Sequence, residues 1–454
     1  MQDKVKERRI PNGTYGAVAS AAGPFRREGA GLFLLVLSVF LLLSGCGRAA
    51  TPQIQGNIPA GTKVDNLDLS GSETKAAQEK LKGWAKGKLA QNLRLVYNGT
   101  EVPVSMRSLG ANLDLNKTWQ AVSAHPGDAI SSYWTVNKGQ AEKTLKKKLS
   151  RFDLPAQNAS YKIAADKFIV QPGVPGRTVD TQALIGRING HTWQDIDNKE
   201  IEIPMTTVAP KVSTESVQRL AFNSVIGEFT TKYAVAEKDR SGNLQRAAAA
   251  LDKKIVLPGQ TFSFNDTVGP RTESTGYKDA YVIVDNKYVE GVGGGVCQVS
   301  STLYNAALLA DLKIAARTPH AMAITYVPLG QDATVDYNNK VDFKFQNNTD
   351  GLLYIRSQTK PGLLTIRIYG KQTGKTVTLK HEIVKETNFQ VERQPDPSLP
   401  SGATAQEQAG NKGYTVKSWR VVKDAQGKVT EEYLGQDVYA PTNQIIRYGV
   451  KGIR

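Results

Sequence analysis

The sequence predicts an α+β protein of several domains, and three observations indicate this fold class. At 454 residues the chain exceeds one typical domain, so two or three folded units are expected. The 41 glycines and 20 prolines, with many Thr, Val and Tyr, favour strands joined by frequent turns. Several stretches between these strands have apolar residues at helical spacing. Hydrophobic residues make up 40% of the chain, which is enough for packed cores.

The first 46 residues have the pattern of a targeting segment. A polar, basic region over 1–28 precedes Gly31–Leu43, an apolar block shorter than the roughly 20 residues of a membrane-spanning helix. Leu43-Ser44-Gly45-Cys46 follows directly and resembles a bacterial lipobox, which implies lipidation of Cys46 at the mature N-terminus. An uncleaved membrane anchor over 1–46 is the alternative. Both predict a protein at the extracytoplasmic face of the bacterial cell membrane, with a spacer over 47–61.

The net charge of +16 indicates an anionic environment. Acidic phospholipid heads, phosphate-bearing wall polymers and nucleic acid would all suit this charge. The sequence contains no signature of a nucleic-acid-binding fold, and the targeting segment predicts a location outside the cytoplasm. Wall polymers and the membrane are therefore the expected partners, and nucleic acid is not.

Residues 62–212 alternate between predicted strands and helices. A helix is expected over 72–87, a hairpin at Asn98-Gly99, two strands around Asp166-Lys167, a helix ending at Asn189-Gly190, and then an edge strand. PGVPGRTVDTQALIGRI and EIPMTTVAPKVS resemble the peptidoglycan-binding domain found upstream of wall enzymes. The resemblance implies binding to the cell wall, by one unit or by two repeats.

Residues 290–312 combine a glycine-rich turn, a cysteine and a helix. The glycines permit positive φ angles and close backbone approach, and Cys297 follows them at the start of the expected helix. The positive helix end and its unpaired amides would lower the pKa of a thiol there. Cys46 has a separate use, so Cys297 has no evident disulfide partner. The alternative is a small hydrophobic residue packed in the core.

His320 and Asp332 follow Cys297 in RTPHAMAITYVP and LGQDATVDY. The runs 321–327 and 333–337 have the pattern of strands, which would place both side chains at strand edges. This order suits a thiol nucleophile, a base and a carboxylate that orients the base, as in papain-like and transglutaminase-like enzymes. Alternatively, His320 caps a turn and Asp332 belongs to a surface loop.

Residues 219–371 resemble the VanW domain through GGGVCQVSSTLYNAALLADLKI and RTPHAMAITYVPLGQDATVDY. The family is named after accessory genes of some vancomycin-resistance clusters, so the resemblance implies an envelope protein linked to glycopeptide resistance. It covers Cys297, Gln298, His320 and Asp332. Aromatic residues are expected to form most of the core of this domain: Phe262, Phe264, Tyr277, Tyr281, Tyr304, Phe343 and Phe345.

Further residues near Cys297 are candidates for oxyanion or ligand binding. Gln298, or backbone amides at the helix start around Gly294 and Gly295, would hold an oxyanion. Arg271 lies in a Gly-Pro turn, where its charge is either solvated or holds a carboxylate. The four histidines have no metal-ligand spacing, so no metal or other cofactor is expected.

Residues 374–450 are predicted to form a small β-rich module. KTVTLKHEIVKET alternates as a strand, and two further strands are expected around Gln426-Gly427. These features resemble the G-five domain of Gram-positive surface proteins, which implies binding to wall sugars.

The sequence thus predicts a membrane-tethered cell-wall protein that binds peptidoglycan and acts in envelope maintenance. The alternative is a thiol-dependent peptidoglycan peptide hydrolase or acyl transferase that uses Cys297, His320 and Asp332.

Overall fold

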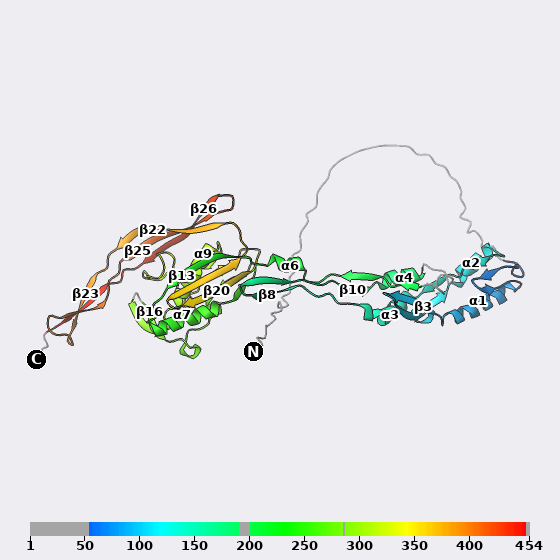
Figure 1. Cartoon of the computed structure of the whole chain (residues 1–454), viewed down its shortest axis with the longest axis horizontal. Helices are drawn as coiled ribbons and strands as arrows, with labels where there is room; N and C mark the ends of the chain where they lie inside the picture. The colour runs from blue at the N-terminus through cyan, green and yellow to red at the C-terminus, as the bar shows by residue number, and fades with distance from the viewer. Residues whose placement is uncertain (1–53, 190–199, 285–286, 451–454) are drawn as a thin grey trace, which may run out of the picture. The chain divides into compact units, whose positions relative to one another are not determined.

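The computed structural model describes residues 54–189, 200–284 and 287–450 (Figure 1). The predicted anchor over 1–46, its Cys46, and Gly190 at the end of a predicted helix lie outside the described residues. Within the described ranges, no helix is both long and apolar enough to cross a membrane.

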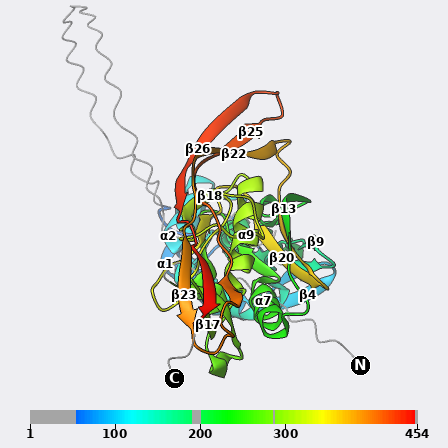
Figure 2. The same cartoon turned by 90° about the vertical axis from the view of Figure 1, so that its left-hand side faces the viewer.

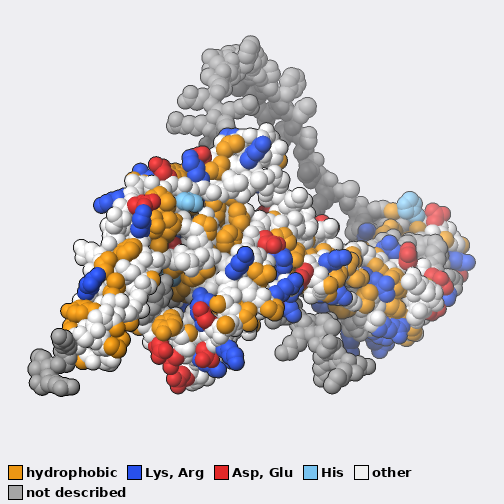
Figure 3. All heavy atoms as spheres, turned by 60° about the vertical axis from the view of Figure 1, so that its left-hand side comes forward, with side chains coloured by type: hydrophobic (Ala, Val, Ile, Leu, Met, Phe, Trp, Pro, Cys, Tyr) orange, Lys and Arg blue, Asp and Glu red, His pale blue; other side chains and the backbone are white. Residues whose placement is uncertain are grey.

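The chain forms two compact units. The first contains the described residues up to Ala159 and those of Pro172–Ser213, and the second contains Ser160–Gln171 and the described residues from Thr214 onward. Both units combine helices with strands, which confirms the predicted α+β, multidomain fold class. On the face shown in Figure 3, Lys and Arg side chains are dispersed and do not gather in one patch.

The first unit contains short sheets and the helices that cover them. Its helices are α1 (Thr74–Lys88), α2 (Leu115–Ala124), α3 (Lys138–Leu149) and α4 (Thr181–Asn189), with 3-10 turns at Met106–Leu109 and Ser150–Phe152. Its strands are β1 (Lys63–Val64), β2 (Leu67–Asp68), β3 (Asn92–Tyr97), β4 (Thr100–Ser105), β5 (Ala111–Leu113), β6 (Ala129–Ile130), β7 (Trp134–Val136), β10 (Gly176–Val179), β11 (Glu200–Glu202) and β12 (Met205–Val208).

Local signals fix several of these elements. Asn98 and Gly99 have φ angles of 46° and 75°, as the predicted two-residue hairpin turn between β3 and β4 requires. The Asp114 side chain caps α2 by accepting the Lys117 N–H at 2.9 Å. Pro204 lacks an N–H and separates β11 from β12, so the single predicted edge strand is split in two. β11 then pairs in parallel with β3, which joins distant parts of the unit in one sheet.

The second unit contains the larger sheets. Its helices are α6 (Thr214–Arg219), α7 (Lys238–Leu251), α8 (Phe264–Val268) and α9 (Val296–Leu309), with a 3-10 turn at Glu273–Thr275. Its strands up to residue 370 are β8 (Ser160–Ala164), β9 (Lys167–Gln171), β13 (Ser224–Lys232), β14 (Lys254–Val256), β15 (Thr261–Ser263), β16 (Asp279–Val284), β17 (Lys287–Val292), β18 (Lys313–Ala316), β19 (Lys344–Gln346), β20 (Leu353–Lys360) and β21 (Leu363–Gly370). The strands that follow are β22 (Thr376–Thr387), β23 (Val391–Asp396), β24 (Thr404–Gln408), β25 (Gly413–Lys423), β26 (Val429–Tyr439) and β27 (Gln444–Gly449).

The helix α9 lies at the centre of the second unit. It contacts β13 and β21 of the antiparallel sheet β13-β21-β20-β14, and it also contacts α7, which packs on β20. Figure 2 shows the same group of elements from the side. Almost every residue of α9 is buried, as expected for a helix enclosed on all sides. Gly227 in β13 makes the close approach possible, because a Cβ there would lie 2.7 Å from the Ala310 nitrogen.

The predicted aromatic core is confirmed except at one position. Phe262, Phe264, Tyr277, Tyr304, Phe343 and Phe345 are all buried. The prediction for Tyr281 was wrong, since its side chain is 64% exposed. It lies on β16, which pairs only with β17 among the described strands, so the outward face of this hairpin has no covering layer.

The hairpin β8–β9 packs in the second unit, although it lies within the sequence segment 62–212. Phe168 on β9 makes an edge contact with Phe222, whose ring stacks on Tyr354 at 5.3 Å. Arg356 pairs with Asp166 in the hairpin turn. Burial of these rings explains why the hairpin belongs to the second unit.

Where it is described, the segment after residue 375 consists of strands joined by turns and loops, as the sequence predicts. β25 lies between β22 and β26 in one antiparallel sheet. In a second sheet β27 pairs in parallel with β23 and antiparallel with β24. The predicted turn at Gln426-Gly427 joins β25 to β26, and the Asp424 carboxylate accepts the Gln426 and Lys428 N–H groups.

Candidate active site

Cys297 lies in the first turn of α9. Gly295 precedes the helix with a φ of 102°, and Cys297 is partly exposed while its neighbours Val296 and Gln298 are buried. Its thiol lies 3.6 Å from the Val335 carbonyl oxygen. The structure therefore places Cys297 at a helix start, as the sequence predicts.

The glycines of this turn make room for neighbouring backbone. A Cβ on Gly294 would lie 2.6 Å from the Tyr281 carbonyl oxygen, and one on Gly295 would lie 2.9 Å from that of Arg240. The amide of Asn243, on α7, donates to the Gly294 oxygen at 3.1 Å and holds the turn on the helix. Both glycines thus have a packing role in the structure, in addition to the predicted role of the backbone amides around them.

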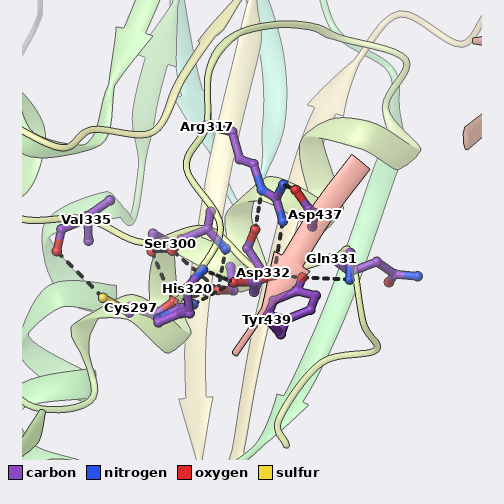
Figure 4. A network of polar contacts seen from close by, with 12 residues as sticks. Cys297, Ser300, Arg317, His320, Gln331, Asp332, Val335, Asp437 and Tyr439 are labelled. Atoms are coloured by element: carbon purple, nitrogen blue, oxygen red, sulfur yellow. Dashed lines mark hydrogen bonds and ion pairs between the residues drawn. The ribbon is translucent and has the colours of Figure 1, made fainter. Parts of the chain in front are cut away.

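His320 and Asp332 lie next to each other and are both buried (Figure 4). His320 Nδ1 lies 2.6 Å from Asp332 Oδ2, which also accepts the His320 main-chain N–H at 2.6 Å. Figure 4 shows the Cys297 side chain beside the His320 ring, and His320 lowers the pKa of the thiol. The three residues predicted from the sequence therefore converge in space.

The strands predicted over 321–327 and 333–337 were wrong, because both segments are irregular. In the segment around Asp332, side chains of α9 form hydrogen bonds with main-chain groups that would otherwise pair with a neighbouring strand. Ser300 Oγ donates to the Ala333 oxygen at 2.6 Å, and Ser301 Oγ accepts the Ala333 N–H at 2.9 Å. Asn305 donates to the Gln331 oxygen at 2.7 Å. This polar face of α9 positions the loop that carries Asp332.

The Asp332 carboxylate is held by donors from two parts of the chain, the segment 317–320 and the end of β26. Besides the two His320 groups, Arg317 Nη2 donates to Oδ1 at 3.0 Å and the Tyr439 hydroxyl donates to the same oxygen at 2.6 Å. Arg317 also pairs with Asp437 at 2.6 Å. A buried carboxylate with this many donors remains ionised and keeps one orientation.

The three side chains shift one another's pKa values. Burial would raise the pKa of Asp332, yet His320, Arg317 and the Tyr439 hydroxyl lower it to about 2. Burial opposes the charged form of His320, but hydrogen bonds to Asp332 and Cys297 raise the pKa of His320 to about 9. Burial would also raise the pKa of Cys297, and the hydrogen bond and charge of His320 lower it instead. These directions favour a thiolate–imidazolium pair near neutral pH.

Gln298 does not face the thiol as an oxyanion donor would. Its amide nitrogen donates to the Lys232 oxygen at 2.8 Å and to Thr231 at 3.0 Å, so both of its N–H groups are engaged. Its oxygen accepts from Arg240 at 2.8 Å. Gln298 is buried and fastens α9 to β13.

Arg271 is half-buried, which excludes the fully solvated alternative. Its guanidinium lies over the Phe264 and Tyr337 rings, and Nη2 donates to the Asn265 side chain at 2.7 Å. The other terminal nitrogen, Nη1, is buried without a hydrogen-bond partner among the described residues. Burial lowers the pKa of Arg271, and the Cys297 thiolate opposes this shift. Arg271 therefore adds positive charge near the thiol.

Sequence reasoning missed several residues of this site. Tyr326 lies with its ring 6.4 Å from that of His320, and it interacts with Ser301. Arg317 stood beside the histidine motif and could have been found there as a charged partner. Asp437 and Tyr439 lie in a different sequence segment, and no local pattern points to them. Within the described residues, no three His, Cys, Asp or Glu side chains form a cluster that could hold a metal ion.

The fold and the site define a multidomain protein whose central α+β domain brings together a cysteine, a histidine and an aspartate. Comparison with family models assigns the segments. Residues 239–369 match the model described as "VanW like protein", residues 376–451 match "G5 domain", and residues 102–199 match "Putative peptidoglycan binding domain". The matches confirm the three resemblances predicted from the sequence, and they support association with the bacterial cell wall.

Two curated relatives are similar to part of the chain. The chain is 38% identical over 200 residues to the "Uncharacterized protein YoaR" of Bacillus subtilis (strain 168), a match that covers 44% of this chain and 65% of the relative. It is 32% identical over 121 residues to the "Vancomycin B-type resistance protein VanW" of Enterococcus faecalis (strain ATCC 700802 / V583), covering 26% of this chain and 44% of the relative. The chain thus spans less than two thirds of either relative.

Two solved structures match a short part of the chain. The "IgA1 Protease G5 domain structure" is 26% identical, covers 17% of this chain and 93% of its own, and has a TM-score of 0.13. "Crystal structure of HP0197-G5" is 26% identical, covers 16% of this chain and 97% of its own, and has a TM-score of 0.11. At these TM-scores the two likenesses support no conclusion about the fold.

Proposed function

We propose that this protein is tethered outside the bacterial membrane, binds peptidoglycan, and carries out thiol-dependent acyl transfer or hydrolysis on peptidoglycan stem peptides. The observation that carries the catalytic part is the buried His320–Asp332 pair beside a partly exposed thiol at a helix start. The match of residues 102–199 to a peptidoglycan-binding family supports the choice of substrate. The resemblance to the VanW relative supports a link to glycopeptide resistance.

In the proposed reaction, the Cys297 thiolate attacks the carbonyl carbon of a peptide bond and forms an S–C bond. The C–N bond then breaks, and the imidazolium of His320 gives its proton to the leaving amine. Water or the amine of a second stem peptide next attacks the thioester while His320 takes up a proton. The S–C bond breaks and the thiolate is restored. Asp332 stays ionised throughout and holds the His320 ring.

Two charged or polar features near the thiol suit such a substrate. Main-chain N–H groups at the start of α9 are the proposed donors to the developing oxyanion, because the first turn of a helix leaves amides unpaired. Arg271 is the proposed ligand of a substrate carboxylate, since its Nη1 has no partner among the described residues and its charge lies near Cys297.

The catalytic proposal predicts a product that depends on Cys297. The full chain carrying Cys46→Ser is incubated with disaccharide-peptides released from purified peptidoglycan, and products are identified by mass spectrometry. We expect shortened or cross-linked peptides and an acyl adduct on Cys297. Cys297→Ser should abolish both, because an alcohol lacks the lowered pKa of this thiol.

The competing function is binding to the wall without catalysis, and the family match at residues 102–199 favours it. The same proteins are sedimented with purified sacculi as the matched measurement. If the wild-type protein and Cys297→Ser both bind to sacculi and neither forms a product, the protein binds the wall without catalysis and the enzymatic proposal is rejected.

The tether makes a separate prediction at Cys46. A lipobox that follows an apolar block directly should yield a mature protein that begins with a diacylglyceryl cysteine. Mass spectrometry of the protein extracted from membranes would detect this group. A mature chain that retains residues 1–46 unmodified would support the uncleaved anchor instead.

A further inference from the structure

Strand β26, in the segment that matches the G5 family, reaches the histidine and aspartate of the central domain. Tyr439, the last residue of β26, is 2% exposed. Its hydroxyl donates to Asp332 Oδ1 at 2.6 Å and accepts the Gly330 N–H at 2.9 Å. The hydroxyl is therefore fixed from both sides, and it constrains the Asp332 carboxylate from a direction that the central domain leaves open.

A second residue of the same strand acts through Arg317. The Asp437 carboxylate accepts from Arg317 Nη1 at 2.6 Å, and Arg317 Nη2 donates to Asp332 Oδ1 at 3.0 Å (Figure 4). The Arg317 guanidinium also lies over the Tyr304 ring of α9. Burial would lower the pKa of Arg317, but Asp437, Tyr304 and Asp332 raise it above its usual range, so the arginine stays charged.

The contact between β26 and the central domain extends beyond these two side chains. Ala440 N–H donates to the Ala321 oxygen at 2.8 Å, directly beside His320, and Ala440 forms a bridge with Met322. On β25, the buried Arg420 donates to the Leu312 oxygen at 2.7 Å. The Ala440 contacts hold the irregular segment that carries His320, and the Arg420 bond holds β25 against the residue that precedes β18.

We propose that the C-terminal module completes the active centre, with Tyr439 and Asp437 as positioning residues that fix the Asp332 carboxylate and, through it, the His320 ring. This inference rests on the proposed thiol chemistry at Cys297. It assigns to the G5-like segment a role in the reaction centre, in addition to any binding of wall sugars.

The carboxylate geometry explains why the strand is needed. Oδ2 of Asp332 takes both hydrogen bonds from His320, and Oδ1 takes those from Arg317 and Tyr439. Without the hydroxyl, Oδ1 depends on Arg317 alone, and the carboxylate gains freedom to rotate about its Cα–Cβ and Cβ–Cγ bonds. The His320 ring then spends less time in contact with the thiol, so less of the thiolate is stabilised.

The test uses the full chain with Cys46→Ser, so that iodoacetamide reports on Cys297. Labelling rates are measured from pH 5 to 9 for Tyr439→Phe, which removes one hydroxyl, and for Asp437→Asn. The matched control is Ser418→Ala, since Ser418 is a buried residue on β25 whose hydroxyl has no partner among the described residues. Melting temperatures are recorded for every variant.

We expect Tyr439→Phe to slow labelling at pH 6 by about tenfold and to move the midpoint of the pH profile upward, because a hydrogen bond to a charged group is lost. Asp437→Asn should have an effect in the same direction, and Ser418→Ala should stay within about twofold of the parent rate. A purely structural contact would lower the melting temperature without moving the midpoint.

Two results overturn the inference and are distinct from each other. If Cys297 is reactive in the parent protein and the pH profile is unchanged in both Tyr439→Phe and Asp437→Asn, the positioning role is rejected. The proposed thiol chemistry is unaffected by that result. If Cys297 does not react in the folded parent protein, both the proposed function and this inference are rejected. Should Tyr439→Phe fail to fold, Asp437→Asn decides by the same criteria, since it keeps the tyrosine.

Discussion

Replacing His320 with Ala is expected to slow iodoacetamide labelling of Cys297 about 100-fold at pH 6. In the native protein the imidazolium stabilises the thiolate by a hydrogen bond and by its charge, and these outweigh the effect of burial on the pKa of Cys297. Removing the ring leaves burial, which raises the pKa of the thiol, opposed only by weaker contributions such as the Arg271 charge. The midpoint of the labelling profile should therefore move to higher pH, because less thiolate is present at pH 6.

The direction of the pH dependence follows from the two shifts. The Cys297 pKa is lowered and the His320 pKa is raised to about 9, so the ion pair exists between the two values. Labelling of Cys297 in the native protein should therefore reach its plateau at a lower pH than labelling of a free thiol, whose pKa is about 8.5. The measurement is a rate profile from pH 4 to 10 in the Cys46→Ser background.

His381→Ala is the control, because His381 is exposed on β22 and is not one of the residues described around the cysteine. It should reproduce the parent profile. If Cys297 in the folded protein does not react until the chain is denatured, the thiol serves packing and the catalytic proposal has to be abandoned.

The sequence predicted local elements well where short signals decide the structure. Asn98-Gly99 and Gln426-Gly427 mark hairpin turns, and the glycine turn before Val296 marks the start of α9. Tyr281 was assigned to the core because aromatic residues are usually buried. Burial depends on whether another layer covers the strand, and none of the described strands pairs with this hairpin or covers the exposed Tyr281.

The sequence also predicted which three residues would converge, but not how they are held. The segments after His320 and Asp332 have strand-like composition, yet both are irregular. Hydroxyl groups on α9 bind the backbone of the segment after Asp332, and the Ala440 N–H binds the backbone of the segment after His320. Ser300 and Ser301 were visible as hydroxyls near the helix start, although their partners were not. Tyr439 lies 107 residues beyond Asp332, and only the folded chain shows that the two meet.

Replacing Asp332 with Asn should lower the free energy of unfolding by about 3 kcal/mol, a loss typical of breaking a buried ion pair by removing one partner. The carboxylate is 1% exposed and accepts from His320, Arg317 and Tyr439. An asparagine has nearly the same shape, but its amide group presents donors where these partners also donate. The Arg317 cation would then keep Asp437 as its remaining acidic partner.

The loss should depend on pH in a defined way. The folded-state pKa of Asp332 is lowered from 3.8 to about 2, so its contribution to stability is present above about pH 4 and is lost as the pH falls toward 2. Urea unfolding of the full chain at pH 7 and at pH 3 measures this contribution. The difference between the parent protein and Asp332→Asn should be larger at pH 7 than at pH 3.

Asp350→Asn is the matched control in the same domain. Asp350 pairs with Lys371 at 2.7 Å, but its side chain is 78% exposed, so the loss should remain below about 1 kcal/mol. Equal effects of the two substitutions would show that Asp332 is no more than a surface charge. The buried network of His320, Arg317 and Tyr439 predicts a clear difference, because a carboxylate removed from water depends on its partners for nearly all of its stabilisation.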